Sequence, residues 1–138
     1  MAQGKIMALD YGEVRIGIAM TDLLQTIASP FETYKRKDTE KDLNFLSELA
    51  KNNSVVKIVI GLPLNMDGSE GDRAKATREF GEKLKDRCEL EIEYIDERLT
   101  SVEAEEILIE SGMRREKRKE VIDKIAASLI LESYLNRY

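Results

Sequence analysis

A short run of β-branched and apolar residues at positions 55–60, VVKIVI, most constrains what this chain can fold into. Runs of this composition are typical of a strand that is buried on both faces of a sheet. Amphipathic helices are predicted on both sides of it in the sequence, over residues 38–52 and 70–86, and the first of them places Leu43 and Leu46 on one face. The sequence therefore predicts an α/β fold in which helices cover a sheet that contains this strand.

The remaining elements complete a mixed sheet. Residues 4–10 and 15–20 read as two strands joined by a short turn, and residues 28–34 as an edge strand because they contain Pro30. A fifth strand is expected from Leu90 to the acidic pair at 96–97. A helix with a capping box is predicted from Thr100 to Gly112, and a last helix from about Glu120. With no linker or repeat, we expect a single domain over residues 1–138.

The composition narrows the chemistry. The 138 residues include no histidine, which excludes a catalytic triad or general base built on imidazole. Cys88 is the single cysteine, so no internal disulfide is possible, a usual zinc site is disfavoured, and a reducing, cytoplasmic location is expected. No apolar run is long enough to cross a bilayer. Against 22 basic residues stand 27 acidic ones, so catalysis is expected to use carboxylates, hydroxyls or a hard cation.

The acidic residues of interest lie at the ends of predicted elements. Asp10 ends the first strand, Asp96 and Glu97 end the last strand, and Asp123 lies beside the apolar face of the last helix. Each has an ordinary alternative explanation. Asp10 could simply begin a turn. Asp96 and Glu97 could form a solvated charge pair with Arg98. Asp123 could stabilise a helix N-terminus. Together, however, such carboxylates would repel one another unless a proton or a cation bridges them, and Mg²⁺ suits oxygen ligands of this kind. The pattern favours a divalent metal site for phosphodiester cleavage.

Four separate motifs in order resemble the YqgF/RuvX family of ribonuclease H-like nucleases, and the resemblance covers nearly the whole chain. They are an opening D-x-G-x-x-R-x-G-x-A hairpin at 10–19, a G-L-P-L-N-M-D-G-S loop at 61–69, a D-E-R-L-T-S segment at 96–101 and a D-x-x-A-A helix at 123–127.

The resemblance implies a ribonuclease H-like fold with a mixed five-stranded sheet in the order 3-2-1-4-5 and helices on both faces. It implies a metal site for Mg²⁺ or Mn²⁺ at Asp10, Asp96, Glu97 and Asp123, with Asp10, Glu97 and Asp123 as the catalytic residues. Whether Asp96 or Glu97 is the ligand stays open, with Glu97 favoured by analogy with related resolvases.

A second group of residues is expected to contact nucleic acid. Arg15 and Arg98 lie next to proposed catalytic carboxylates and could grip phosphate, although ordinary ion pairing would also account for them. Asn65 and Ser69 could hold a phosphate near a helix start, or serve only in a turn and as a helix cap. A dense basic run could follow a nucleic-acid backbone, or form a solvated connector; it comprises Arg114, Arg115, Lys117, Arg118 and Lys119.

Three functions remain in view. The main hypothesis is an endonuclease that processes the 5′ end of the 16S rRNA precursor, a function attributed to the resembled family. The second is a resolvase of four-way DNA junctions, which should be a two-fold dimer because it must cut two strands symmetrically. The third is a noncatalytic nucleic-acid-binding module. The expected partner is structured RNA or branched DNA, with no membrane, and the protein is expected to be a monomer or a homodimer.

Overall fold

The computed structural model describes residues 4–97 and 115–137, with the side chains of 115–120 and 137 outside the description. Eight elements follow one another in this part of the chain: β1 (Lys5–Tyr11), β2 (Arg15–Thr21), β3 (Ala28–Lys35), α1 (Thr39–Asn52), β4 (Val55–Leu62), α2 (Asp72–Cys88), β5 (Glu91–Asp96) and α4 (Arg115–Arg137). The helix predicted between residues 100 and 112 lies outside the described residues.

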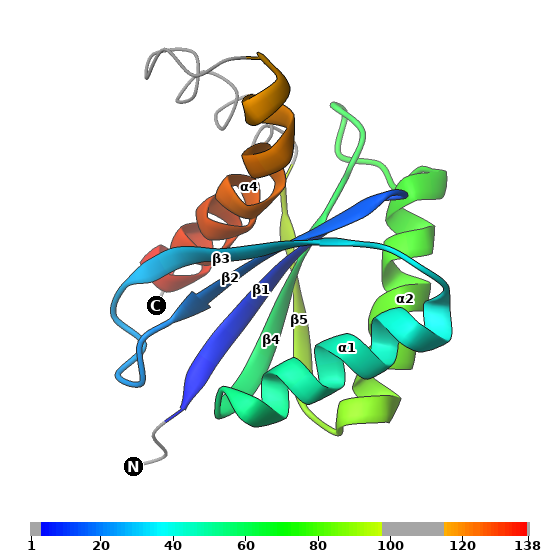
Figure 1. Ribbon diagram of the computed structural model, residues 1–138. Helices are drawn as coiled ribbons and strands as arrows, with labels where there is room; N and C mark the ends of the chain where they lie inside the picture. The colour runs from blue at the N-terminus through cyan, green and yellow to red at the C-terminus, as the bar shows by residue number, and fades with distance from the viewer. Residues whose placement is uncertain (1–3, 98–114, 138) are drawn as a thin grey trace.

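The five strands form one sheet in the order β3-β2-β1-β4-β5, which confirms the predicted topology. The pairs β1–β2 and β2–β3 are antiparallel, whereas β1–β4 and β4–β5 are parallel. Pro30 lies in β3 at the sheet edge, as expected. Helices α1 and α2 cover one face of the sheet and α4 covers the other, as Figure 1 shows. The predicted α/β layering is therefore confirmed.

Side-chain alternation along the strands divides the core into two layers. On β1, Met7 and Leu9 belong to the core beneath α1 and α2, whereas Ile6 and Ala8 belong to the core beneath α4. All the residues from Met7 to Leu9 are fully buried, which is why this strand is apolar on both faces. The same alternation decides which residues at the strand ends face α4.

Helix α4 begins earlier than predicted. The sequence pattern placed the start near Glu120 and left the basic run before it, but the helix starts at Arg115. Arginine, lysine and glutamate are good helix formers, and no proline or glycine separates residue 115 from the apolar part of the helix. The basic residues 115, 117, 118 and 119 therefore belong to the first turns of α4. None of the helices in the described ranges could span a membrane.

Candidate active site

A cavity of about 460 Å³ opens where β1, β4 and β5 end, beside the start of α2 and the middle of α4. This is the edge at which the parallel strands of an α/β sheet present their carboxyl ends, and it is the usual place for a ligand in such folds. The cavity brings together three of the predicted carboxylates with several residues of the loop after β4. It is lined by Asp10, Gly12, Pro63, Leu64, Asn65, Gly71, Asp72, Arg73, Glu97 and Asp123.

Asp10 and Glu97 form the centre of this cavity. Asp10 continues the Ile6–Ala8 side of β1 toward α4, and its carboxyl group is hydrogen-bonded to that of Glu97. The pKa of Asp10 is raised to about 6. Burial is the largest cause and the nearby Asp123 charge also raises the pKa, while the Glu97 hydrogen bond and the Arg73 charge lower it. Two carboxyl groups can hydrogen-bond only when a proton lies between them. Because the pKa of Asp10 is raised to about 6, a proton on Asp10 can form this bond at mildly acidic pH.

The alternation of side chains at the end of β5 also places the two adjacent acidic residues there, Asp96 and Glu97, on opposite faces of the sheet. Ile95 packs in the core beneath α4, so Glu97 returns to that face, and its side chain is only 8% exposed. Its carboxyl group lies against Gly61 of β4, where a Cβ atom would be 2.8 Å from Glu97 Cδ. Asp96 is exposed and does not line the cavity. The structure thus brings Glu97, and not Asp96, to Asp10.

Asp123 reaches the cavity because α4 packs closely on β2. Gly17 is the partner of Asp10 across the β1–β2 ladder, and a Cβ atom at Gly17 would collide with the backbone carbonyl of Asp123. On the same face of β2, Arg15 Nε donates to Asp123 Oδ2 at 2.8 Å. Arg15 is thus in an ion pair, one of the two roles expected for it. This contact holds the Asp123 carboxylate at the cavity wall.

This set of oxygen donors has the chemistry that a divalent cation requires. A cation could replace the proton between Asp10 and Glu97, since both groups would then be ionised and bridged by positive charge. In the orientations seen among the described residues, no three such side chains converge on a single point suited to a metal ion. Asp10 and Glu97 would form the primary pair of ligands, and Asp123 would join them by turning from Arg15.

The other predicted contacts fall partly in the cavity. Asn65 lines it, and Asn65 Nδ2 donates to Ser69 Oγ at 3.0 Å. Ser69 also bonds to Asp67 and does not line the cavity, and the N-cap of α2 is Gly71. Ser69 therefore stabilises the loop, while Asn65 is in a position to contact a ligand. Arg98 and Arg114 lie outside the described residues, as do the side chains of Arg115, Lys117, Arg118 and Lys119.

Residues 4–137 match the model of a protein family described as RuvX, Holliday junction resolvase. The chain belongs to this family.

Curated relatives agree with the family match over almost the full length. A protein of Endomicrobium trichonymphae is 50% identical over 133 residues, which are 96% of this chain and 95% of the relative. One of Halothermothrix orenii is 48% identical over 132 residues, 96% of this chain and 94% of the relative. Both carry the name "Putative pre-16S rRNA nuclease". The predicted family and enzyme class, a nuclease and therefore a hydrolase, are confirmed.

Solved structures share the fold at low sequence identity. RuvC of T. thermophilus, solved with a Holliday junction substrate, has a TM-score of 0.61 at 10% identity and covers 97% of this chain and 95% of its own. The fowlpox virus Holliday junction resolvase has a TM-score of 0.57 at 14% identity and covers 97% and 99%. These likenesses confirm the ribonuclease H-like fold.

Two residues of the cavity escaped the sequence analysis: Asp72 and Arg73, the first two residues of α2. Arg73 lies close enough to Asp10 to lower its pKa. A signal for Arg73 does exist in the sequence. A cation in the first turn of a helix is opposed by the helix dipole, so an arginine there calls for another reason, such as an anionic ligand.

Proposed function

We propose that the protein is a metal-dependent endonuclease that hydrolyses a phosphodiester bond of precursor 16S rRNA, at its 5′ end. The observation that carries the proposal is the convergence of the carboxyl groups of Asp10 and Glu97 in an open cavity, with Asp123 on the cavity wall. Clustered carboxylates facing phosphate would weaken a pure binding protein, and they become useful when a cation lies between them and the substrate. Close relatives over the full length carry the name of a nuclease for this RNA.

Each residue has a separable task in this proposal. Asp10 and Glu97 hold Mg²⁺ or Mn²⁺, and Asp123 completes the site. When bound, such an ion activates a water molecule and stabilises negative charge on the phosphate. Before a metal ion binds, Arg15 holds Asp123 at the cavity wall through its 2.8 Å contact, and Arg73 supplies positive charge on the wall where a phosphate would enter. No covalent intermediate between enzyme and substrate is involved.

Cleavage of a labelled 16S precursor by matched variants tests the proposal. We expect Asp10→Asn and Glu97→Gln to lower the single-turnover cleavage rate in Mg²⁺ at least 100-fold, because each removes a charged ligand. Asp96→Asn, which changes an acidic residue outside the cavity, is expected to stay within about threefold of the wild type. Unchanged cleavage by Asp10→Asn would falsify the metal assignment. Tight RNA binding without product, in both Mg²⁺ and Mn²⁺, would instead favour a noncatalytic module.

A second candidate substrate is the four-way DNA junction, which the description of the family favours. It requires the same carboxylates but two active sites related by a two-fold axis. Junction DNA and precursor RNA should therefore be compared side by side with the same enzyme preparation. Symmetric cuts in the junction by a protein that sediments as a dimer would support the resolvase. A monomer that cuts only the RNA supports the proposal above and a cytoplasmic role in ribosome assembly.

A further inference from the structure

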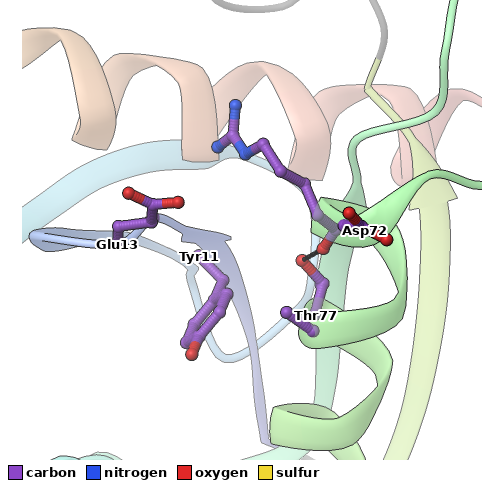
Figure 2. A pocket seen from close by; sticks show the side chains of 7 residues that line it. Tyr11, Glu13, Asp72 and Thr77 are labelled. Atoms are coloured by element: carbon purple, nitrogen blue, oxygen red, sulfur yellow. Dashed lines mark hydrogen bonds between the residues drawn. The ribbon is translucent and has the colours of Figure 1, made fainter.

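A second cavity, of about 240 Å³, lies beside the active-site cavity; we call it the side pocket. Figure 2 shows Tyr11 at the end of β1 and Glu13 of the β1–β2 turn on one side of it, and Asp72 and Thr77 of α2 on the other. The side pocket is lined by Tyr11, Gly12, Glu13, Asp72, Arg73, Ala76 and Thr77. Gly12, Asp72 and Arg73 also line the active-site cavity, so the two cavities share a boundary. A molecule bound across this boundary would occupy both.

The side pocket is held in shape by packing. The Tyr11 ring stacks on Phe80 with 4.4 Å between ring centroids, and the Arg36 guanidinium lies 4.7 Å from the Tyr11 ring centre. Arg36 is fixed in turn, because its Nε donates to the fully buried Asp42 at 2.9 Å. On the opposite wall, Thr77 Oγ1 donates to the Arg73 carbonyl oxygen at 2.8 Å. The pocket therefore exists before any ligand arrives.

The charges around the side pocket restrict what can enter it. Glu13 and Asp72 have no ion-pair partner among the described residues, and both carboxylates border the pocket. Among the described residues of the pocket lining, these two carboxylates outnumber the single cation, Arg73, so the net charge of the lining is negative. The lining therefore disfavours a phosphate inside the side pocket and accepts hydrogen bonds from a neutral ligand that carries donors. In a nucleic acid, the neutral part is the nucleoside. The phosphate joined to that nucleoside would remain in the active-site cavity, near Arg73.

We propose that the side pocket binds the ribonucleoside attached to the scissile phosphate, and that Asp72 accepts a hydrogen bond from its 2′-hydroxyl group. This inference rests on the proposed function. A ribose is bonded directly to the phosphate, so it must lie at the boundary of the two cavities, which is where Asp72 lies. The base extends farther, toward Tyr11 and Ala76. Because DNA lacks the 2′-hydroxyl group, this contact makes the active site prefer RNA.

Single-atom changes in the RNA test the contact. The substrate is the 16S precursor with one 2′-deoxy or one 2′-fluoro nucleotide on either side of the cleaved bond. The 2′-fluoro sugar keeps the ribose pucker but cannot donate a hydrogen bond. At one of the two positions, we expect both changes to lower the wild-type single-turnover rate about 10-fold or more, since the lost bond has a charged acceptor.

Variants of α2 connect this preference to Asp72. In Asp72→Ala, the ratio of the rates on ribose and deoxyribose substrates should fall to within about twofold of unity. Asp72→Asn keeps the shape of the side chain and an acceptor oxygen but loses the charge, so its preference should fall to between the wild-type and Asp72→Ala values. Asp72→Leu, which has a similar size and no acceptor, should lose the preference and covers the case in which the alanine variant is unfolded. Glu79→Ala changes an exposed carboxylate on the same helix, outside both cavities, and should keep the wild-type ratio.

The outcomes separate this inference from the function on which it rests. Metal-dependent cleavage that is indifferent to the 2′ substituent at both positions overturns the role of Asp72 and leaves the nuclease intact. A 2′ preference that persists in folded Asp72→Ala overturns it as well. Cleavage that is absent from the wild type, or equal in wild type and Asp10→Asn, shows instead that the proposed nuclease function has failed.

Discussion

Without a bound cation, the Asp10 carboxylate lowers the free energy of unfolding of the protein. Asp10 follows the buried residues 6–9 of β1, and its pKa is raised from 3.8 to about 6, chiefly by burial. The folded protein therefore binds this proton more tightly than the unfolded chain does. The stabilisation associated with the proton is fully present below about pH 4 and is lost as the pH rises through about 6. At neutral pH the ionised group lowers the free energy of unfolding.

Asp10→Asn should thus stabilise the metal-free protein while abolishing its activity. We expect the free energy of unfolding in EDTA at pH 7.5 to increase by about 1–3 kcal/mol, because a shift of one pKa unit corresponds to about 1.4 kcal/mol. At pH 4 the difference should nearly vanish. Urea unfolding at both pH values measures it, with Asp96→Asn as the exposed control. A variant that is less stable than the wild type at pH 7.5 would contradict this view of Asp10.

How well the sequence predicted each site residue depended on where that residue falls in the pattern of strands and helices. The sequence singled out Asp10, Glu97 and Asp123 because each was predicted near the end of an element, and the structure brings all three to one cavity. It left open whether Asp96 or Glu97 is the metal ligand. Consecutive residues on a strand point to opposite faces, and the strand end could not be located to one residue. Asp72 and Arg73 were missed because their importance arises from the approach of α2 to the β1–β2 turn, a contact between distant segments.

At the scale of elements, the packing of α4 on β2 brings Asp123 to the strand ends. The two elements approach so closely that Gly17 faces the backbone of Asp123 directly, and the small, fully buried Ala126 and Ala127 lie on the same helix. The spacing of apolar positions in the sequence predicted this helix and its inward face, but not its start at Arg115. Helix ends depend on local propensity, which a charged run does not reveal through its hydrophobic pattern.

Gly17→Ala tests this packing. The added methyl group would collide with backbone atoms of α4, which cannot rotate away, so the helix must shift from the sheet. We expect a loss of about 2–4 kcal/mol in the free energy of unfolding and at least a 10-fold lower cleavage rate under conditions where the variant is folded.

A matched control for this change is Gly71→Ala. There the new Cβ atom would lie 3.3 Å from the Asn65 side chain, which can adjust, and the backbone conformation is one that alanine adopts readily. Its stability should change by no more than about 1 kcal/mol. Equal effects of the two substitutions on stability would argue against close packing of α4 as the device that places Asp123.

At the scale of the whole molecule, the sheet has one apolar layer beneath α1 and α2 and another beneath α4. Alternation and helical periodicity extend over many residues, so the sequence pattern predicted the strands, the helices and their layering. The strand order came only from the resemblance to the family, because pairing between distant strands leaves no mark on local periodicity. The active-site cavity lies where the second layer reaches the strand ends, and the side pocket adjoins it at Gly12, Asp72 and Arg73. Binding of a cation at this junction should therefore stabilise the entire fold, since the unfolded chain has no such site.

The central claim is that a divalent cation replaces the proton shared by Asp10 and Glu97. Calorimetric titration with Mn²⁺ at pH 6, in two buffers of different ionisation enthalpy, tests it most directly by counting the protons released. The account predicts release of roughly half a proton per ion, since Asp10 is then about half protonated, with affinity rising toward pH 7.5 and both effects lost in Asp10→Asn. Binding that releases no proton, or that is unchanged in Asp10→Asn, would contradict it.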